Sequence, residues 1–115
     1  MMSTTNHSFG DILLVPYPCT ELGERKKRPA IVISSNSYNQ QHKDFILIAV
    51  TSHFNTPLPS DNLFIRYWRQ AGLLKPSVVK PVIKTFPSSF SLEPIGPLLT
   101  KDKDALREFL RKIMG

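Results

Sequence analysis

The sequence has one cysteine, Cys19, and only five glycines in 115 residues. A single cysteine excludes an intrachain disulfide and suits a reducing compartment, so we expect a cytoplasmic protein. None of the glycines stands in a G-x-G or P-loop arrangement, which excludes the common phosphate-cradling loops. No apolar run approaches the roughly 20 residues of a membrane-spanning helix. Residues 1–8 are polar and unlike a secretory signal, and we interpret them as a disordered tail.

Clustered metal ligands are also missing. The nine acidic residues are scattered along the chain, whereas two-metal nucleases need grouped carboxylates. The histidines and the cysteine do not have the close spacing of a zinc site. We therefore expect neither a metal nor another cofactor. His7, in the tail, and His42, in an expected loop, are interpreted as surface histidines.

Positive charge is plentiful, with a formal net charge of +6 and a pI near 9.7. Ten of the 15 lysines and arginines fall in two segments without acids, five in 25–43 and five in 62–92. If the fold joins these segments, one face of the protein is positive and suits a polyanion. A solvated basic surface without a partner explains the charge equally well.

The order of apolar runs and turn residues predicts a mostly β domain with a helix at its end. The expected strands are Asp11–Tyr17, Ala30–Ser34, Phe45–Thr51, Asn62–Ile65 and Ser77–Thr85. We expect an exposed loop over Cys19–Lys27 and a short helical turn within Ser35–Lys43. Pro81 predicts a bulge or an edge position in its strand, because proline cannot donate a ladder hydrogen bond.

The terminal segment has the clearest helical pattern. Leu106, Phe109, Leu110 and Ile113 recur on one helical face, and Thr100 is the expected N-cap. Acidic residues follow the cap and basic residues stand near the end, which suits the helix dipole.

The remaining chemistry belongs to an arginine and a hydroxyl pair. Lys27-Arg28-Pro29 precedes one apolar run, and Thr51-Ser52 ends the next. An arginine fork can bind two phosphate oxygens and stabilise the charge that builds on phosphorus. With the ribose 2′-OH as the nucleophile, cleavage needs no metal and the substrate must be RNA. Arginine and threonine are poor bases, so Arg28 as a phosphate ligand or a solvated residue remains an alternative.

Four segments together resemble the PemK/MazF toxins of bacterial toxin–antitoxin systems. They are Gly10-Asp11-Ile12-Leu13-Leu14-Val15-Pro16-Tyr17-Pro18, Lys27-Arg28-Pro29-Ala30-Ile31-Val32-Ile33-Ser34-Ser35, Ile48-Ala49-Val50-Thr51-Ser52 and Ala71-Gly72-Leu73-Leu74-Lys75-Pro76-Ser77-Val78-Val79-Lys80. The resemblance implies one domain over 9–115, mainly β, with an SH3-like β-barrel of the MazF/CcdB kind and a C-terminal α-helix.

The resemblance also implies a function. It is a sequence-selective, metal-independent endoribonuclease acting on single-stranded RNA, with a homodimeric state and a cognate antitoxin that silences it. Growth arrest and DNA binding with the antitoxin belong to the same expectation. The family's catalytic arginine and threonine fall on Arg28 and Thr51. Cleavage through the 2′-OH leaves a 2′,3′-cyclic phosphate and a 5′-OH.

Further residues are expected to bind RNA around that pair: Lys27, Ser52, His53, Ser77, Lys80 and Lys84. One position departs from the pattern, because Val82 stands where some related toxins carry an acid. This departure favours an alternative from another class, a non-catalytic binding protein of the same fold that holds gyrase, or only RNA and an antitoxin. Retention of Arg28 and Thr51 favours the enzyme.

Overall fold

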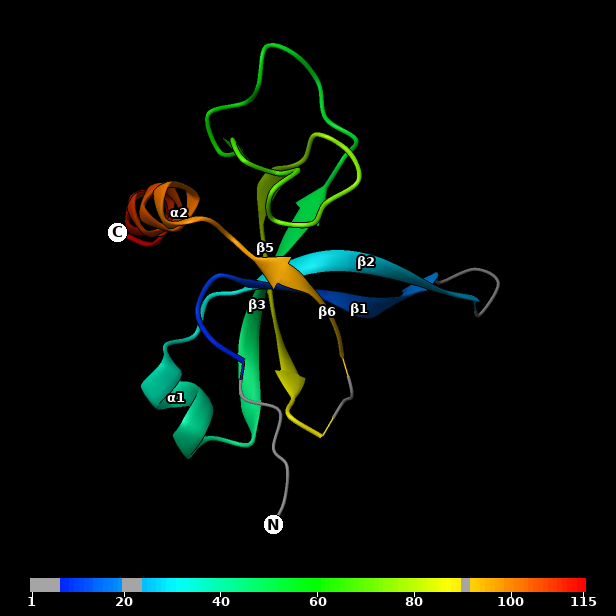
Figure 1. Cartoon of the computed structure of the whole chain (residues 1–115), viewed down its shortest axis with the longest axis vertical. Helices are drawn as coiled ribbons and strands as arrows, with labels where there is room; N and C mark the ends of the chain where they lie inside the picture. Colours follow the sequence, from blue (N-terminus) through cyan, green and yellow to red (C-terminus); the bar gives the residue numbers. More distant parts are fainter. Residues whose placement is uncertain (1–6, 20–23, 90–91) are drawn as a thin grey trace.

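The computed structural model of the protein describes residues 7–19, 24–89 and 92–115 (Figure 1). Six strands and two helices follow one another along the chain. They are β1 (Asp11–Cys19), β2 (Glu24–Val32), α1 (Asn36–Gln41), β3 (Asp44–Thr51), β4 (Leu63–Phe64), β5 (Val78–Pro87), β6 (Glu93–Pro97) and α2 (Thr100–Met114). The mainly β composition and the terminal helix agree with the sequence-based prediction.

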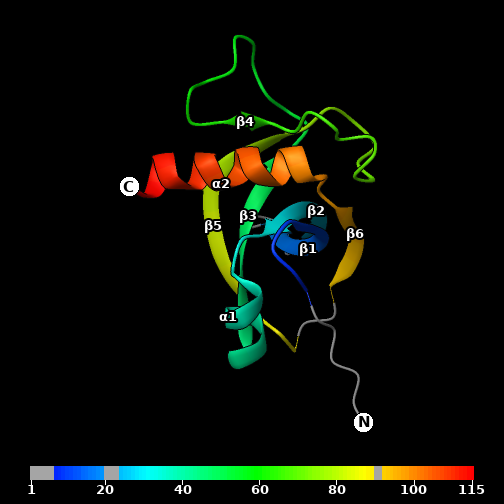
Figure 2. The same cartoon turned by 60° about the vertical axis from the view of Figure 1, so that its left-hand side comes forward.

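All six strands join one antiparallel sheet in the order β4-β5-β3-β2-β1-β6. The sheet is strongly curled and forms a half-barrel, with α2 lying across its concave side (Figure 2). The first strand therefore pairs with the last, although most of the chain separates them. This confirms the predicted barrel-like class of fold.

The strands bury both of their faces, because successive side chains point to opposite sides of a sheet. Ile12 and Ile31 belong to the cluster under α2, whereas their neighbours Leu13 and Ala30 belong to a second cluster on the other face. The second cluster also contains Val15, Val32, Phe45, Leu47, Phe86 and Leu92. Two-sided burial explains why the central strands read as continuous apolar runs.

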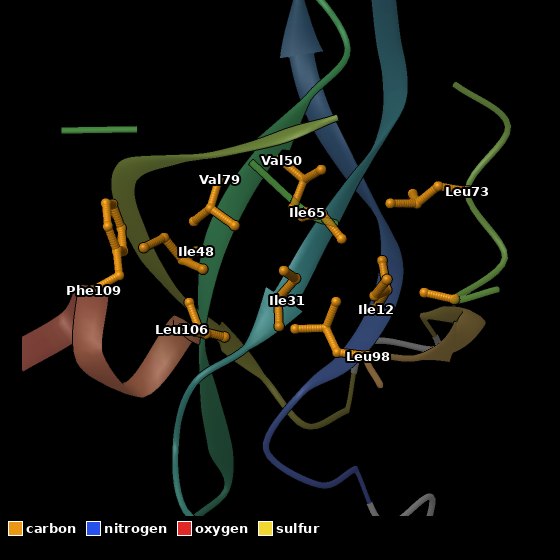
Figure 3. Packing of buried hydrophobic residues seen from close by; sticks show 11 residues of the cluster. Ile12, Ile31, Ile48, Val50, Ile65, Leu73, Val79, Leu98, Leu106 and Phe109 are labelled. Atoms are coloured by element: carbon orange, nitrogen blue, oxygen red, sulfur yellow. The ribbon is translucent and has the colours of Figure 1, made fainter. Parts of the chain in front are cut away.

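Helix α2 contributes Leu106 and Phe109 to the first cluster, where they meet residues of β1, β2, β3 and β5 (Figure 3). The side chain of Asp102 is buried on the same helical face. The expected cap was wrong, since Leu99 holds the N-cap position and forms no side-chain cap hydrogen bond.

Two further expectations about elements were wrong. Residues 24–27, expected in a loop, form the start of β2 and pair with residues 16–19 of β1. The middle of that expected loop, 20–23, lies outside the described residues. Strand β6 was not expected, because Pro94, Gly96 and Pro97 all disfavour a strand interior. Its edge position removes this objection, since one side of an edge strand needs no ladder hydrogen bonds.

Pro81 lies in a bulge of β5, as expected. Ile83 pairs with Ile48 and Val79 pairs with Val50, so Ala49 alone lies opposite residues 80–82. The extra residues release the proline from the ladder and increase the local bend.

Of the tail expected over residues 1–8, residues 1–6 lie outside the described residues. His7 is not the expected surface histidine, because it is only 7% exposed. Its ring meets the Phe45 ring edge-on at 4.9 Å, and its carbonyl oxygen accepts a hydrogen bond from Asn39 Nδ2 at 2.9 Å. No helix in the described part of the chain is long and apolar enough to span a membrane.

Candidate active site

A pocket of about 580 Å³ opens where the middle of β2 and the end of β3 meet β6 and the segment between β4 and β5. Apolar residues such as Leu14, Val50 and Leu73 line it. Its polar lining comes from distant parts of the chain: Lys27, Arg28, Thr51, Ser52, His53, Lys75, Ser77 and Glu93.

Arg28 reaches the pocket from β2, where it pairs with Val15 of β1. Strand β2 pairs with β3 from Ala30, opposite Ala49, onward. Arg28 lies two residues before Ala30 and Thr51 two residues after Ala49, and both line the pocket. The guanidinium is exposed and makes no hydrogen bond or ion pair with the residues that the structure describes. Its five donors are therefore available to a ligand.

Thr51 ends β3 and is half-buried, opposite Val78 of β5. Its Oγ1 accepts a hydrogen bond from the backbone N–H of His53 at 3.0 Å and lies 3.4 Å from the His53 carbonyl oxygen. The turn from 51 to 53 thus fixes the orientation of the hydroxyl group. Ser77 is buried, and its Oγ donates a hydrogen bond to the Lys75 carbonyl oxygen at 2.9 Å. The proton of this hydroxyl group is therefore used within the loop.

One wall of the pocket depends on two glycines. Gly72 has φ of +97°, and a Cβ there would lie 2.9 Å from the Ile95 carbonyl oxygen. A Cβ on Gly96 would lie 2.5 Å from the Ala71 carbonyl oxygen. This close backbone approach holds the loop that carries Leu73 and Lys75 against β6.

The same loop is tied to α2 by a carboxylate. Asp102 accepts hydrogen bonds from the backbone N–H groups of Arg66 at 3.0 Å and Tyr67 at 2.8 Å. Both carboxylate oxygens are used, which satisfies this buried acid. The helix thereby positions the turn that leads into the pocket wall.

The pocket brings together six of the eight residues expected from the sequence: Arg28, Thr51, Lys27, Ser52, His53 and Ser77. Lys80 and Lys84 do not line it. Both are exposed on β5, Lys80 within the bulge and Lys84 beyond it. Val82, at the position of the acid in some related toxins, lies on that same part of β5 and also does not line the pocket.

Two polar residues of the pocket were missed in the sequence, Lys75 and Glu93. Glu93 opens β6, and its Oε1 lies 3.8 Å from Lys27 Nζ. The sequence offered one weak signal, because Glu93 is the first acid after the acid-free segment 62–92. Interpreting Glu93–Pro97 as an edge strand beside β1 would have brought it to the site.

The electrostatic character of the pocket is positive, since Lys27, Arg28 and Lys75 outnumber the single acid Glu93. Such a site attracts a phosphodiester. Within the described ranges, no three His, Cys, Asp or Glu side chains are grouped as metal ligands.

Comparisons with solved structures show which fold this is. The MazE–MazF complex of Deinococcus radiodurans (form II) gives a TM-score of 0.75 at 18% identity, covering 96% of this chain and 97% of that chain. A mycobacterial endoribonuclease in complex with its cognate antitoxin gives 0.70 at 14% identity, covering 96% and 94%. At these identities the likeness concerns the fold alone, which is MazF-like.

Comparison with protein families extends over nearly the whole chain. No curated protein matches the chain significantly in sequence. A family model does match, over residues 8–114, and its description is PemK-like, MazF-like toxin of type II toxin-antitoxin system. The match covers every described helix and strand, including those that carry Arg28, Thr51 and the rest of the pocket. The chain therefore belongs to the PemK-like, MazF-like toxin family of type II toxin–antitoxin systems.

Proposed function

We propose that this protein is an endoribonuclease toxin that cuts single-stranded RNA without a metal. One observation carries the proposal: Arg28 and Thr51 come from different strands and line the same positive pocket. An arginine fork and a fixed hydroxyl group on two sides of a phosphodiester can hold its non-bridging oxygens. They also stabilise the extra negative charge of the transition state.

The nucleophile in this proposal is the ribose 2′-OH next to the scissile phosphate. Its attack forms the O2′–P bond and breaks the P–O5′ bond, which yields a 2′,3′-cyclic phosphate and a 5′-OH. Because the nucleophile belongs to the substrate, no activated water is required. DNA lacks the 2′-OH and therefore cannot be cut by this route. Lys27, Ser52 and His53 line the same pocket, and in this proposal they contact the RNA near the same phosphate.

The proposal includes a cytoplasmic homodimer that a cognate antitoxin silences. Two related structures contain an antitoxin, that of the mycobacterial endoribonuclease and that of the Deinococcus MazE–MazF pair. An acidic, disordered antitoxin segment would be attracted by the charge that attracts RNA. We expect the two ligands to compete, and neutralising Lys80 and Lys84 together to weaken both.

The direct experiment incubates the purified protein with a mixed RNA pool in EDTA and maps the new 5′ ends. Cuts at a short shared sequence, with 5′-OH ends, are expected. A matched oligonucleotide with a single 2′-deoxy nucleotide at the scissile position should stay intact. A requirement for magnesium or cleavage of the deoxy oligonucleotide would refute this mechanism. Tight RNA or antitoxin binding without any cuts would favour the non-catalytic alternative instead.

A further inference from the structure

Glu93 is the one carboxylate among the residues that line the pocket. A negative charge there repels the phosphates of the proposed substrate, so it weakens binding. A carboxylate does not bind phosphate, so we looked for another role for Glu93. Its position beside Arg28 and the need of the reaction for a proton acceptor indicate that role.

The sheet holds Glu93 close to Arg28 in space. Leu14 of β1 pairs with Glu93 on one side and with Pro29, next to Arg28, on the other. Lys27 reaches over β1 to Glu93, with 3.8 Å between Nζ and Oε1. Both side chains remain accessible, at 67% and 63% exposure. The ion pair therefore directs the carboxylate toward β2 while leaving its oxygens free to accept a hydrogen bond from a ligand.

The proposed reaction needs a group that takes the proton from the 2′-OH. Arginine and lysine carry no acceptor. The Thr51 hydroxyl is a poor base and already accepts the His53 N–H, and the Ser77 hydroxyl donates to its own loop. Of the pocket side chains, only Glu93 and His53 carry a carboxylate or an imidazole, the groups that most often transfer protons in catalysis.

We infer that Glu93 is the general base of this toxin and that His53 is the general acid. The inference rests on the function proposed above. As the 2′-oxygen attacks phosphorus, its proton passes to the Glu93 carboxylate. As the P–O5′ bond breaks, the His53 imidazolium gives its proton to the leaving 5′-oxygen. Lys27 positions the carboxylate, and Arg28 binds the charged phosphorane.

The test compares wild type with Glu93→Gln in two measurements. One is the single-turnover cleavage rate against pH, and the other is binding of an uncleavable 2′-deoxy oligonucleotide. Glu93→Gln should cut about 100-fold more slowly or worse, which is the usual contribution of a general base. It should bind the oligonucleotide at least as tightly, because a repulsive charge is gone. Its rate should also lose the fall toward acidic pH that a carboxylate base produces.

Two control variants separate this role from simpler ones. Glu108→Gln removes a carboxylate from a surface ion pair on α2, 2.8 Å from Arg111, and should behave as wild type. Lys27→Gln breaks the pocket ion pair but keeps the carboxylate, so it should weaken binding and retain the acidic fall in rate. Equal pH profiles for Lys27→Gln and Glu93→Gln would reduce Glu93 to a structural ion-pair partner and overturn the inference.

The role of His53 has its own readout. An RNA with sulfur in place of the 5′-bridging oxygen has a leaving group that departs without a proton. His53→Ala should therefore be slow on ordinary RNA and near wild type on the sulfur substrate, while Glu93→Gln stays slow on both. If wild type cuts RNA and Glu93→Gln cuts equally well at every pH, only this inference fails. If wild type cuts no RNA, the proposed function fails as well.

Discussion

Arg28 illustrates how a single residue acquires its role from two neighbouring strands. Its backbone is fixed by pairing with Val15 on β1, and its side chain lies beside the end of β3. We predict that Arg28→Ala slows RNA cleavage by about two to three orders of magnitude, the cost of removing a preorganised donor to a developing anion. Arg28→Lys should recover only part of this, because an ammonium group lacks the planar fork.

The matched control for Arg28 is Arg66→Ala. Arg66 is exposed, does not line the pocket, and contributes only its backbone N–H to Asp102. The substitution removes the same charge, so an effect of net charge alone would appear in both variants. The measurement is the initial rate at which each variant cleaves a labelled RNA oligonucleotide. Full activity of Arg28→Ala would contradict the proposed role of Arg28 in stabilising the transition state.

A second prediction at this scale concerns His7 and pH. Burial lowers the pKa of His7 from its ordinary 6.5, and the nearby Asp11 carboxylate opposes this only in part. Between the lowered pKa and 6.5, the unfolded chain binds more protons than the folded one, so stability rises with pH. The thermal midpoint should therefore fall when the pH drops from 7.5 to 5.5.

Replacing His7 with Phe should reduce that fall, since the buried ring can no longer take up a proton. His42→Phe is the control, because His42 is exposed and stacks on Tyr38 with ring centroids 4.0 Å apart, which a phenyl ring can reproduce. Thermal unfolding of the three proteins at both pH values gives the comparison. An unchanged pH dependence in His7→Phe would show that other groups control it.

The sequence predicted individual site residues unevenly. Arg28 and Thr51 were predicted because Arg28 precedes one apolar run, Thr51 ends the next, and each has a distinctive neighbour, Pro29 or Ser52. The sequence could not place Glu93, because its position depends on pairing between the first strand and the last. His7 was misjudged for a similar reason, since its burial comes from Phe45 and Asn39, far away in the chain.

At the scale of elements, apolar or β-forming runs between turn residues predicted β1, β3 and β5, and helical periodicity predicted α2. The prediction began β2 too late, because the first half of this strand is charged. That half pairs with β1 in a hairpin that extends away from the core, where a strand needs no apolar side chains (Figure 1). Strand β6 was missed because its prolines and glycine are tolerated only at a sheet edge. Local propensity cannot show which strand ends up at an edge.

The contact between α2 and the 66–67 turn provides the test at this scale. Asp102→Ala removes the buried carboxylate, and the backbone N–H groups of Arg66 and Tyr67 lose their hydrogen-bond acceptor. We predict a loss of about 3 kcal/mol in the free energy of unfolding. Asp104→Ala is the control on the same helix, because its pair with Arg107, at 3.2 Å, is exposed and is worth less than about 1 kcal/mol.

Urea titrations of both variants measure these differences directly. A loss in Asp102→Ala no greater than that in Asp104→Ala would show that the turn is held by other contacts. Reduced cleavage by Asp102→Ala at temperatures where it remains folded would show in addition that the turn positions the pocket wall.

The whole molecule exposes a surface that predicts a dimer. Six consecutive residues of β5, from Lys80 to Thr85, are exposed between buried Val79 and Phe86. Among the six, Val82 is 43% and Ile83 is 36% exposed, so apolar side chains face outward in the middle of a strand. A second copy related by a two-fold axis would cover them.

Light scattering at micromolar concentration should therefore give the mass of two 13.1 kDa chains. Val82→Asp should shift the mass toward one chain, because a carboxylate buried between copies is costly. Met114→Asp, at the exposed end of α2, should leave the mass unchanged. A wild-type mass of one chain at this concentration would contradict the dimer.

The pairing of β1 with β6 has a consequence for how the protein is made. Strand β6 and helix α2 follow the other described elements along the chain, so the ribosome adds them after β1 to β5. While residues 93–114 are still being added, β1 has no partner on its outer side and the pocket lacks its β6 wall. Nascent chains thus carry Arg28 and Thr51 without the β6 wall beside them, and the pocket is complete only after residues 93–97 have been added and have paired with β1.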